Sequence, residues 1–418
     1  MRPFRKAPVR SILIVKLSSL GDVLLASAVL SYMRACFPDA AIDWVVEAGG
    51  AEILRDNRAL RRVLIFPRAA IQSALPWRYF RARRIWRAFI HELRAERYDL
   101  VLDLQGLARS WAVSLAARLA PDGARAGKGR FPFIRYKSPH KRKYLRHALP
   151  SYFEIFHVLG FASPPPEQIC LSFAPVQEGE EQAERFEVRN SGGELPSFAL
   201  ALGREGQAER FGDRNSGGKL PYVIFHAFTT WRSKHWPEGH WVRLALLCKA
   251  RGLRVIISGA AADGARAEAL LAQIRLAADS IEAASAFWAQ SAAGRLDFAG
   301  FAALARTAYA VISVDSFPMH LAAASRAWVI SLHGPTDPAR TGPWGERCRA
   351  LTAAGVSCPM RGRPEFGISS AASSLSVPCK RAPCRKRSCR DTVCMRGITP
   401  ESVLAALDDA FPDRAKRL

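Results

Sequence analysis

The sequence predicts an α/β fold built from two doubly wound, Rossmann-like domains. Loops of the phosphate-binding kind occur twice, as Ser18-Ser19-Leu20-Gly21-Asp22 and as Val314-Asp315-Ser316-Phe317-Pro318-Met319-His320. Each stands between an apolar strand pattern and a helical pattern, so the first amides of the helix point at the crevice above a parallel sheet. Strand and helix patterns also alternate in both halves of the chain, which indicates two such sheets.

In the first half, short apolar runs alternate with helical patterns. The expected strands are Ile12–Leu17, Ile42–Glu47, Val63–Phe66 and Leu100–Leu104. The expected helices are Val23–Cys36, stopped by Pro38, and Leu107–Leu119. Together they form a doubly wound domain over residues 1–173.

The second half restarts the alternation at residue 221. The expected strands are Tyr222–Phe225, Leu253–Ser258, Ala310–Val314 and Trp328–Leu332. The expected helices are His240–Ala250, Ala262–Ile274, Phe301–Ala308, Met319–Ser325 and Pro400–Phe411. Thr399 is the expected N-cap of the last helix, since Pro400 suits the first helical position. The second Rossmann-like domain is therefore predicted over residues 221–357, followed by a tail at 358–418.

Residues 174–220 are rich in Glu, Arg, Gly, Ser and Gln, a composition that forms a core poorly. Within them, Glu181–Pro196 recurs 25 residues later as Gly206–Pro221 with 12 of 16 positions identical. A single duplication is too short for a stacked repeat fold, which needs three or more copies. We interpret the segment as a duplicated, mobile linker.

The composition of the 418 residues suits two ordinary domains, with 49% hydrophobic residues. Near the N-terminus, Lys16 and Asp22 interrupt the apolar runs, which are too short for a spanning helix or a secretory signal, so we expect a cytoplasmic protein. The net charge of +24 favours a polyanionic partner: nucleic acid, an anionic membrane face or a phosphorylated glycolipid.

Part of this charge is clustered. Arginines at 78, 81, 83, 84 and 87 alternate with aromatic residues between Trp77 and Trp86. This pattern is typical of an interfacial helix and of a nucleic-acid surface, and an ordinary helix with a solvated face explains it equally well. A second basic run holds Lys137, Lys141, Arg142, Lys143 and Arg146.

Six motifs in order, over about residues 11–345, resemble the lipopolysaccharide heptosyltransferases of glycosyltransferase family 9. They are Lys16–Val23, Asp43–Glu47, Asp103–Gly106, Thr229-Thr230 with Lys234–Glu238, Ser313–Ser316 with His320, and Gly334–Pro338. The resemblance implies a GT-B fold, in which an N-terminal acceptor-binding domain and a C-terminal nucleotide-sugar-binding domain face each other across a cleft. It further implies an ADP-heptose donor and an acidic glycolipid acceptor, the Kdo and heptose region on lipid A. The enzyme would then work in the cytoplasm, peripherally on the inner membrane.

Inverting glycosyl transfer needs a base for the acceptor hydroxyl and positive charge for the departing diphosphate. Asp22 is the candidate base, since Gly21 beside it lets a substrate approach closely; alternatively it caps the helix expected at Val23. Lys234 is the candidate cation, and the resemblance places Thr229 and Thr230 on the phosphates. An ordinary surface role for Lys234 is the alternative.

The loop of Asp315, Ser316 and Phe317 should face the phosphates with its amides. The family pattern usually has Gly after the Asp-Ser pair, so Phe317 and Pro318 are departures that would narrow the pocket. His320 resembles the family's histidine near the diphosphate, and a core or capping role is the alternative. Asp263 stands where the family commonly has Glu for the ribose hydroxyls, so its contact would be shorter or water-mediated.

Four cysteines recur every five residues among basic residues, at Cys379, Cys384, Cys389 and Cys394, with Cys358 upstream. Basic neighbours would lower thiol pKa values and favour a zinc or iron–sulfur site, although this spacing is wider than in zinc ribbons. Disulfides are the alternative, against which a reducing cytoplasm argues. We expect no obligatory catalytic metal, because the resemblance implies that amides and basic side chains hold the diphosphate.

Two other classes of function stay open at this point. A nucleic-acid-binding protein would use the basic helix and the tail, but it would leave Asp22, Lys234 and Asp315 without a shared purpose. A different GT-B enzyme, using another nucleotide sugar or catalysing epimerisation, would keep the cleft and change the donor.

Overall fold

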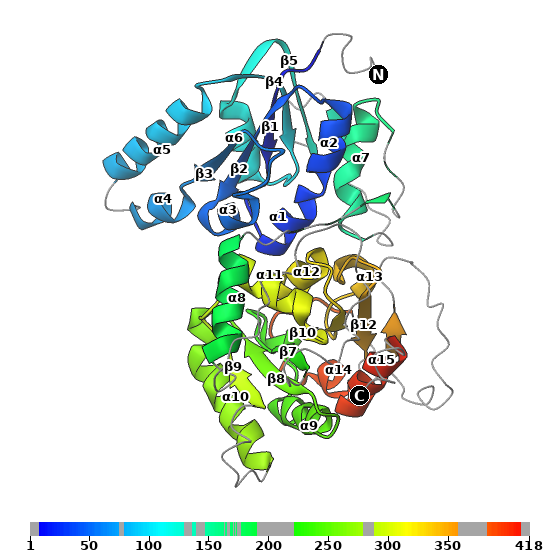
Figure 1. Cartoon of the computed structure of the whole chain (residues 1–418). Coiled ribbons are helices and arrows are strands. Elements are labelled where there is room, and N and C mark those ends of the chain that lie inside the picture. Colours follow the sequence, from blue (N-terminus) through cyan, green and yellow to red (C-terminus); the bar gives the residue numbers. More distant parts are fainter. Residues whose placement is uncertain are drawn as a thin grey trace. The chain divides into compact units, whose positions relative to one another are not determined.

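A computed structural model of the chain describes residues 8–74, 79–128, 136–138, 147–162, 164, 168–169, 171, 173, 177–189, 221–278, 288–357 and 383–410 (Figure 1). The chain forms two compact units. Unit 1 consists of residues 1–173 with 339–346 and 359–362, and unit 2 contains the remaining residues.

Unit 1 contains a six-stranded sheet in the order β3-β2-β1-β4-β5-β6, with all neighbouring strands parallel. Its strands are β1 (Ser11–Val15), β2 (Ala41–Glu47), β3 (Arg62–Phe66), β4 (Arg97–Asp103), β5 (Arg118–Lys128) and β6 (Tyr136–Ser138). This is the strand order of a Rossmann fold, in which the winding reverses between β1 and β4.

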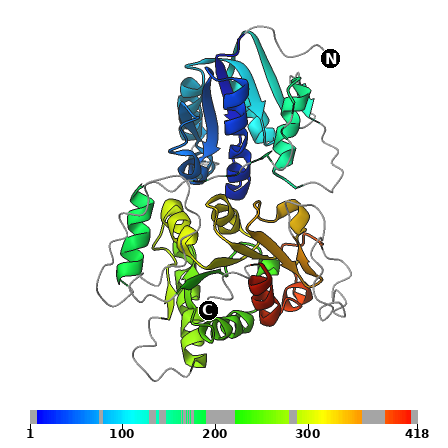
Figure 2. The same ribbon diagram turned by 45° about the vertical axis from the view of Figure 1, so that its right-hand side comes forward.

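The helices of unit 1 lie on both sides of this sheet, as Figures 1 and 2 show. They are α1 (Leu20–Ser27), α2 (Val29–Cys36), α3 (Ala48–Leu54), α4 (Arg68–Ala74), α5 (Tyr79–Leu93), α6 (Ala108–Ala116) and α7 (Pro150–Val158). The prediction of a single helix over Val23–Cys36 is wrong. The helical region begins at Leu20, and Ala28 divides it into α1 and α2. At the division, the Ser27 hydroxyl donates to the carbonyl of Leu24 at 2.7 Å, a bond that competes with helix geometry.

The helix predicted over Leu107–Leu119 also extends too far. It ends at Ala116, and β5 takes Arg118 and Leu119 into the sheet beside β4. Pro121 and Gly123 hide this strand from a pattern search, because both residues are depleted in strands.

Unit 2 repeats the same winding in a seven-stranded sheet of order β13-β12-β11-β10-β7-β8-β9. Its strands are β7 (Tyr222–His226), β8 (Arg254–Ser258), β9 (Ala289–Ser291), β10 (Ala310–Val314), β11 (Val329–Leu332), β12 (Cys348–Thr352) and β13 (Gly355–Ser357). Only the β12–β13 pair is antiparallel among these strands. The winding reverses between β7 and β10, the counterparts of β1 and β4.

The helices of unit 2 begin with α8 (Gln177–Arg189) and end with α15 (Pro400–Ala410). Between them are α9 (Glu238–Lys249), α10 (Gly264–Ala277), α11 (Phe298–Thr307), α12 (Phe317–Ala324), α13 (Pro338–Thr341), whose later residues belong to unit 1, and α14 (Val393–Arg396). Short 3₁₀ turns occupy Arg232–Lys234 and Ala261–Asp263. The predicted cap of the last helix is confirmed, since the Ser402 amide donates to the Thr399 hydroxyl at 3.1 Å.

The described part of the first copy of the duplicated segment, residues 181–189, is helical rather than an unstructured linker. Helix α8 lies alongside α11 (Figure 2), where Ala183 and Phe186 are buried. Gln182 exchanges two hydrogen bonds with Asp297, the N-cap residue of α11. These contacts form with a distant segment, so local composition did not predict them. The second copy, apart from Pro221, lies outside the described residues.

The described part of the C-terminal tail is packed into unit 2. Met395, Ile398, Val403 and Leu407 are at most 1% exposed and join the core formed by the sheet and helices α9 and α10. Side chains between Cys394 and Leu407 are therefore part of this domain's hydrophobic core. Among the helices described, none has the length and apolar character needed to cross a bilayer.

Candidate active site

The winding reverses between β1 and β4 in unit 1 and between β7 and β10 in unit 2, and we call these two places the switch points. They are the expected ligand positions, since loops diverge there at the carboxyl ends of the strands. In unit 1 the loops after β1 and β4 carry Ser18 and Gln105, and Asp22 follows in the first turn of α1. In unit 2 the loop after β7 leads to Lys234, and β10 is followed directly by Asp315. The topology therefore places the predicted residues at two equivalent positions, one in each unit.

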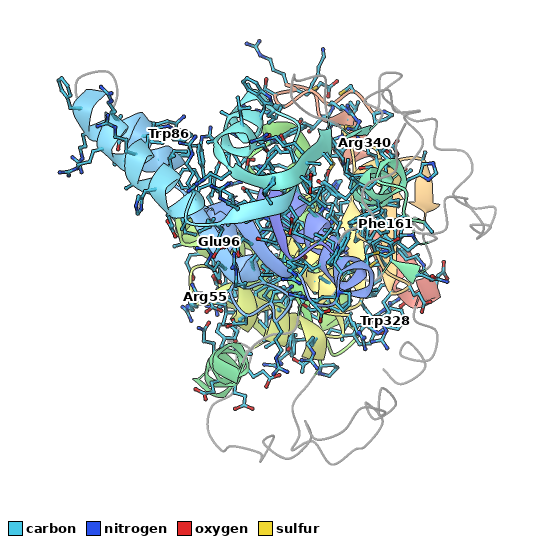
Figure 3. The ribbon with its side chains drawn as sticks, turned by 90° about the horizontal axis from the view of Figure 1, so that it is seen from above. Arg55, Trp86, Glu96, Phe161, Trp328 and Arg340 are labelled. Atoms are coloured by element: carbon cyan, nitrogen blue, oxygen red, sulfur yellow. The ribbon has the colours of Figure 1, made fainter. Side chains whose placement is uncertain are left out.

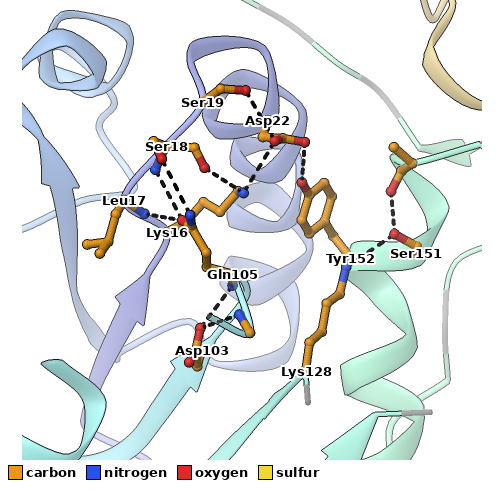
Figure 4. A network of polar contacts seen from close by, with 12 residues as sticks. Lys16, Leu17, Ser18, Ser19, Asp22, Asp103, Gln105, Lys128, Ser151 and Tyr152 are labelled. Carbon is orange, nitrogen blue, oxygen red and sulfur yellow. Dashed lines mark hydrogen bonds and ion pairs between the residues drawn. The ribbon is translucent and has the colours of Figure 1, made fainter. Parts of the chain in front are cut away.

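Asp22 lies in the first turn of α1, with its side chain 44% exposed. Tyr152 donates its hydroxyl to Asp22 Oδ1 at 3.0 Å, and Ser19 donates to Oδ2 at 3.2 Å (Figure 4). The Lys16 ammonium is 3.7 Å from Oδ2 and donates to the Ser18 carbonyl at 2.8 Å. The carboxylate is thus held on three sides while part of it remains accessible.

These contacts keep Asp22 ionised. Burial opposes the charged form, but Lys16 and then the hydroxyls of Tyr152 and Ser19 outweigh burial, and the pKa of the carboxyl falls below its usual value of 3.8. Burial lowers the pKa of the Lys16 ammonium, and the charge of Asp22 opposes that shift. A carboxylate at neutral pH can accept a proton.

The loop after β4 supports the loop after β1. The Gln105 side-chain oxygen accepts hydrogen bonds from the amides of Leu17 at 2.8 Å and Ser18 at 3.1 Å. Asp103 in turn accepts from the amides of Gln105 and Gly106, each at 2.9 Å. Gly106 has φ +69°, and a Cβ there would come within 2.7 Å of the Lys128 carbonyl oxygen. This explains why the sequence Asp-Leu-Gln-Gly occurs beside the Asp22 loop.

Tyr152, Lys128 and Ser151 are site residues that sequence reasoning missed. Tyr152 is 4% exposed on α7, and the Lys128 ammonium lies 4.0 Å from the centre of its ring. Lys128 also donates to the Ser151 hydroxyl at 3.2 Å. The helix start at Pro150 was a usable signal, but a single sequence does not reveal that this helix packs against α2 and reaches Asp22.

In unit 2, Lys234 and Asp315 form a largely buried ion pair. The ammonium is 2.8 Å from Asp315 Oδ2, and the two side chains are 13% and 6% exposed. Thr336, from the Gly334–Pro338 motif, donates to the same carboxylate at 2.6 Å. Burial alone would raise the pKa of this carboxyl, but His333, Lys234 and the Thr336 hydroxyl outweigh burial and lower it.

The two threonines precede this pair in the loop after β7. Thr229 is half-buried, and its carbonyl contacts His235 Nε2 at 2.8 Å. Thr230 is exposed and lies next to the turn that carries Lys234. The structure thus brings Thr229, Thr230 and Lys234 onto one loop.

The loop after β10 starts α12 as predicted, with Ser316 as N-cap and Phe317 as the first helical residue. The Phe317 ring packs edge-on against Phe298, with centroids 4.7 Å apart. This contact fixes the ring on α11, and the narrowing of the donor pocket by Phe317 stays a prediction. His320 is 7% exposed on α12.

Asp263 ends the 3₁₀ turn after β8, where its carboxylate accepts from the Ala260 amide at 3.1 Å. One oxygen thus stabilises the turn that carries it, and its ribose contact stays a prediction. The basic residues Arg78, Lys141, Arg142, Lys143 and Arg146 lie outside the described residues, as do Trp77, Cys170, Cys358 and Cys379. Cys384 and Cys389 are half-buried and Cys394 is buried, all as free thiols. Across the residues that the structure describes, no group of three metal-binding side chains forms.

A family model for glycosyltransferase family 9 (heptosyltransferase) matches residues 86–365. The chain belongs to this family. Lipopolysaccharide heptosyltransferase 1 of Pseudomonas aeruginosa is 30% identical over 80% of this chain and 81% of its own length. The protein of that name from Escherichia coli K12 is 30% identical over 81% of this chain and 93% of its own length. Heptosyltransferase 2 of E. coli K12 is 22% identical over 81% and 87% of the two chains.

Solved structures agree with the fold. The family 9 protein from Veillonella parvula has a TM-score of 0.70 at 17% identity and covers 98% of this chain and 99% of its own. E. coli heptosyltransferase WaaC with ADP has a TM-score of 0.61 at 24% identity and covers 96% and 99%. The predicted GT-B class with two Rossmann-like domains is confirmed, and so is the prediction of a glycosyltransferase of the lipopolysaccharide heptosyltransferase type.

Proposed function

We propose that this chain moves heptose from ADP-heptose to the inner core of lipopolysaccharide and adds the first heptose to the Kdo region on lipid A. The observation that carries the proposal is the ionised, partly accessible Asp22 at the unit 1 switch point of a family 9 fold. The greater identity to the two heptosyltransferases 1 than to heptosyltransferase 2 supports the first-heptose assignment.

In this proposal Asp22 takes the proton from the acceptor hydroxyl as that oxygen attacks the anomeric carbon. ADP leaves from the opposite face, so the configuration of the carbon inverts. Tyr152 and Ser19 each occupy one lone pair of the carboxylate, which leaves others for the incoming proton. Tyr152 therefore orients the base and favours its charged form.

The diphosphate is bound in unit 2 by Lys234, by the hydroxyls of Thr229 and Thr230, and by amides at the start of α12. A helix N-terminus carries partial positive charge, which suits a developing anion. His320 lies one turn into α12 and Asp263 follows β8, where we propose contacts to the diphosphate and to the ribose. Asp315 has a different task, because its carboxylate holds Lys234 in place.

The assay that tests this function measures ADP release from ADP-heptose with two acceptors, Kdo-lipid A and the same molecule already carrying one heptose. We expect release with the first acceptor and little with the second. Release only with the heptosylated acceptor would instead indicate a second-heptose enzyme. Release from a UDP- or GDP-sugar alone would contradict the donor assignment.

We also propose that α5 contacts the acidic glycolipid and the inner leaflet. Ala82, Phe89 and Leu93 bury one side of the helix, whereas Phe80 on it is 83% exposed. Arg81, Arg83, Arg84 and Arg87 are exposed as well. Figure 3 shows α5, with Trp86, standing out from the rest of unit 1. Exposed cations beside an aromatic ring suit an anionic membrane surface.

Charge reversal tests this contact. Arg83→Glu with Arg84→Glu should weaken sedimentation with anionic vesicles and raise the KM for the acceptor, while the donor KM stays unchanged. Arg295→Glu with Arg326→Glu is the matched control, since both arginines are exposed in unit 2. If the α5 variant and the control behave alike, the membrane proposal is wrong.

Transfer should proceed without a catalytic metal, since amides and cations are proposed to hold the diphosphate. Full activity after EDTA treatment is the expected result, and abolished transfer that magnesium restores would contradict it. A zinc or iron–sulfur site at Cys379, Cys384, Cys389 and Cys394 stays a separate proposal, tested by metal analysis of the purified chain and of its Cys389→Ser variant.

A further inference from the structure

The basic segment that precedes α14 contacts two loops of unit 2, those after β7 and β11. The Ser233 amide donates to the Arg387 carbonyl at 3.2 Å, and its hydroxyl donates to the carbonyls of Lys386 and Arg387. The Arg385 amide donates to the Pro335 carbonyl at 2.8 Å. Ser233 is 1% exposed as a result. Residues 385–387, which we name the tail segment, are thus hydrogen-bonded to the loop carrying Lys234 and to the loop carrying Thr336.

Contacts further along the tail fix this position. Cys394 and Met395 close over Gly334, where a Cβ would come within 2.6 Å of Met395 Sδ and 2.9 Å of Cys394 Sγ. The Trp236 indole donates to the Ile398 carbonyl at 2.8 Å. The tail segment is therefore held in place by the residues that follow it, which belong to the core of unit 2.

Trp231 lies in contact with both the tail segment and Lys234. The Lys234 ammonium lies 4.5 Å from the centre of the Trp231 ring, and the guanidinium carbon of Arg387 lies 5.1 Å from it. Both are within the range of a cation–π contact, for which indole is the best ring. One indole thereby places two cations close to the end of β7.

The net charge of the Lys234–Asp315 pair indicates why a second cation would be needed to bind the diphosphate. Lys234 is paired with Asp315, so the two groups together carry no net charge. A departing diphosphate develops negative charge that a neutral pair stabilises less well than a net positive group does. The tail segment has the sequence Arg385-Lys386-Arg387 and contains no acidic residue, and Arg387 is exposed.

We propose that Arg387 is a donor-binding residue that contacts the diphosphate, and that Trp231 positions it together with Lys234. This inference rests on the proposed function for the identity of the donor. It assigns a task to the basic tail that the family motifs, which end near residue 345, do not cover. Arg suits the role because its planar guanidinium binds phosphate oxygens in pairs.

The test compares ADP with AMP, which has one phosphate fewer, in calorimetric titrations of the full chain. Arg387→Gln should bind ADP about tenfold more weakly and AMP less than about twofold more weakly, as loss of one charged contact implies. Arg387→Lys should recover part of the ADP affinity, since it restores charge without the planar fork. Arg390→Gln, an exposed position three residues along the tail, is the control and should match the unmodified chain.

Trp231→Leu should weaken ADP binding as Arg387→Gln does, and thermal unfolding shows whether this half-buried position still folds. An Arg387→Gln variant that binds ADP within twofold of the unmodified chain would overturn the inference. So would equal losses for ADP and AMP, which would place Arg387 away from the second phosphate. If the chain binds ADP but does not turn over ADP-heptose, the proposed function fails while the ADP-to-AMP ratio still decides the role of Arg387. If it does not bind ADP, both fail.

Discussion

Each switch point holds a lysine and an aspartate, and the two pairs differ in exposure to solvent. In unit 1 the Lys16 side chain is 5% exposed and Asp22 is 44% exposed, at a separation of 3.7 Å. In unit 2 Lys234 is 13% exposed and Asp315 is 6% exposed, at 2.8 Å. The carboxylate is the accessible member of the unit 1 pair, whereas both members of the unit 2 pair are largely buried. We therefore propose a base in unit 1 and a diphosphate-binding cation in unit 2.

The aspartates at the carboxyl ends of β4 and β10 differ too. Asp103 accepts from two amides of its own loop, and burial raises its pKa. Asp315 binds Lys234 instead, and its pKa is lowered. Asp103 thus stabilises a loop, whereas Asp315 stabilises a charge. The partner of each carboxylate, more than its place in the fold, determines what it contributes.

The largest expected effect comes from removing the exposed carboxylate of unit 1. Asp22→Asn should lower kcat by about 10²- to 10⁴-fold, the usual contribution of a general base. Steady-state rates of ADP release measure this loss. Asp22→Glu keeps a carboxylate and should retain more activity. A kcat within threefold of the unmodified chain for Asp22→Asn would show that the unit 1 pair is not catalytic.

Breaking the buried pair of unit 2 should affect stability as well as donor binding. Asp315→Asn leaves Lys234 without its counter-charge, at a cost of about 3 kcal/mol in the free energy of unfolding. Because the folded pKa of Asp315 lies below 3.8, its stabilisation is complete above that pH and is lost as the pH falls through the folded pKa. Urea unfolding measures the free energy of unfolding near pH 7 and at lower pH. The values for the variant and the unmodified chain should converge as the pH falls. A constant difference would contradict the ion-pair account.

A smaller effect is expected from the hydroxyl that holds the base. Tyr152→Phe removes the donor to Asp22 Oδ1, so the pKa of the carboxyl should rise and the acid limb of the kcat/KM profile should move to higher pH. The rate at neutral pH should fall by up to about tenfold, the equivalent of one hydrogen bond. Tyr222→Phe is the control, since that hydroxyl bonds to the Leu304 carbonyl in unit 2. If the acid limb of the kcat/KM profile of Tyr152→Phe does not move, Tyr152 contributes packing alone.

Local sequence patterns predicted both sheets and the loops at both switch points. The strands β1, β2, β7, β8 and β10 are buried from both sides, so they stand out as continuous apolar runs. Lys234 and Asp315 were chosen as candidates because their motifs resemble those of family 9 and their loops follow buried strands. The Thr399 cap was found from Pro400 for a local reason of the same kind.

What the sequence did not predict depends on contacts between distant segments. Tyr152 is 130 positions from Asp22, and no periodicity links them. Helix α8 looked like a linker because its buried face needs α11 to be recognised. The tail looked like a separate basic segment until Met395 and Leu407 were found in the core. A single sequence contains no signal for these pairings.

The division of labour between the two pairs is tested most directly by ADP titration of two variants alongside the unmodified chain. Asp22→Asn should bind ADP with unchanged affinity although its turnover is lost. Lys234→Met should bind ADP about tenfold or more weakly, because it removes the charged donor to the diphosphate. The opposite pattern, weakened binding for Asp22→Asn and normal binding for Lys234→Met, would contradict the assignment of base to unit 1 and cation to unit 2.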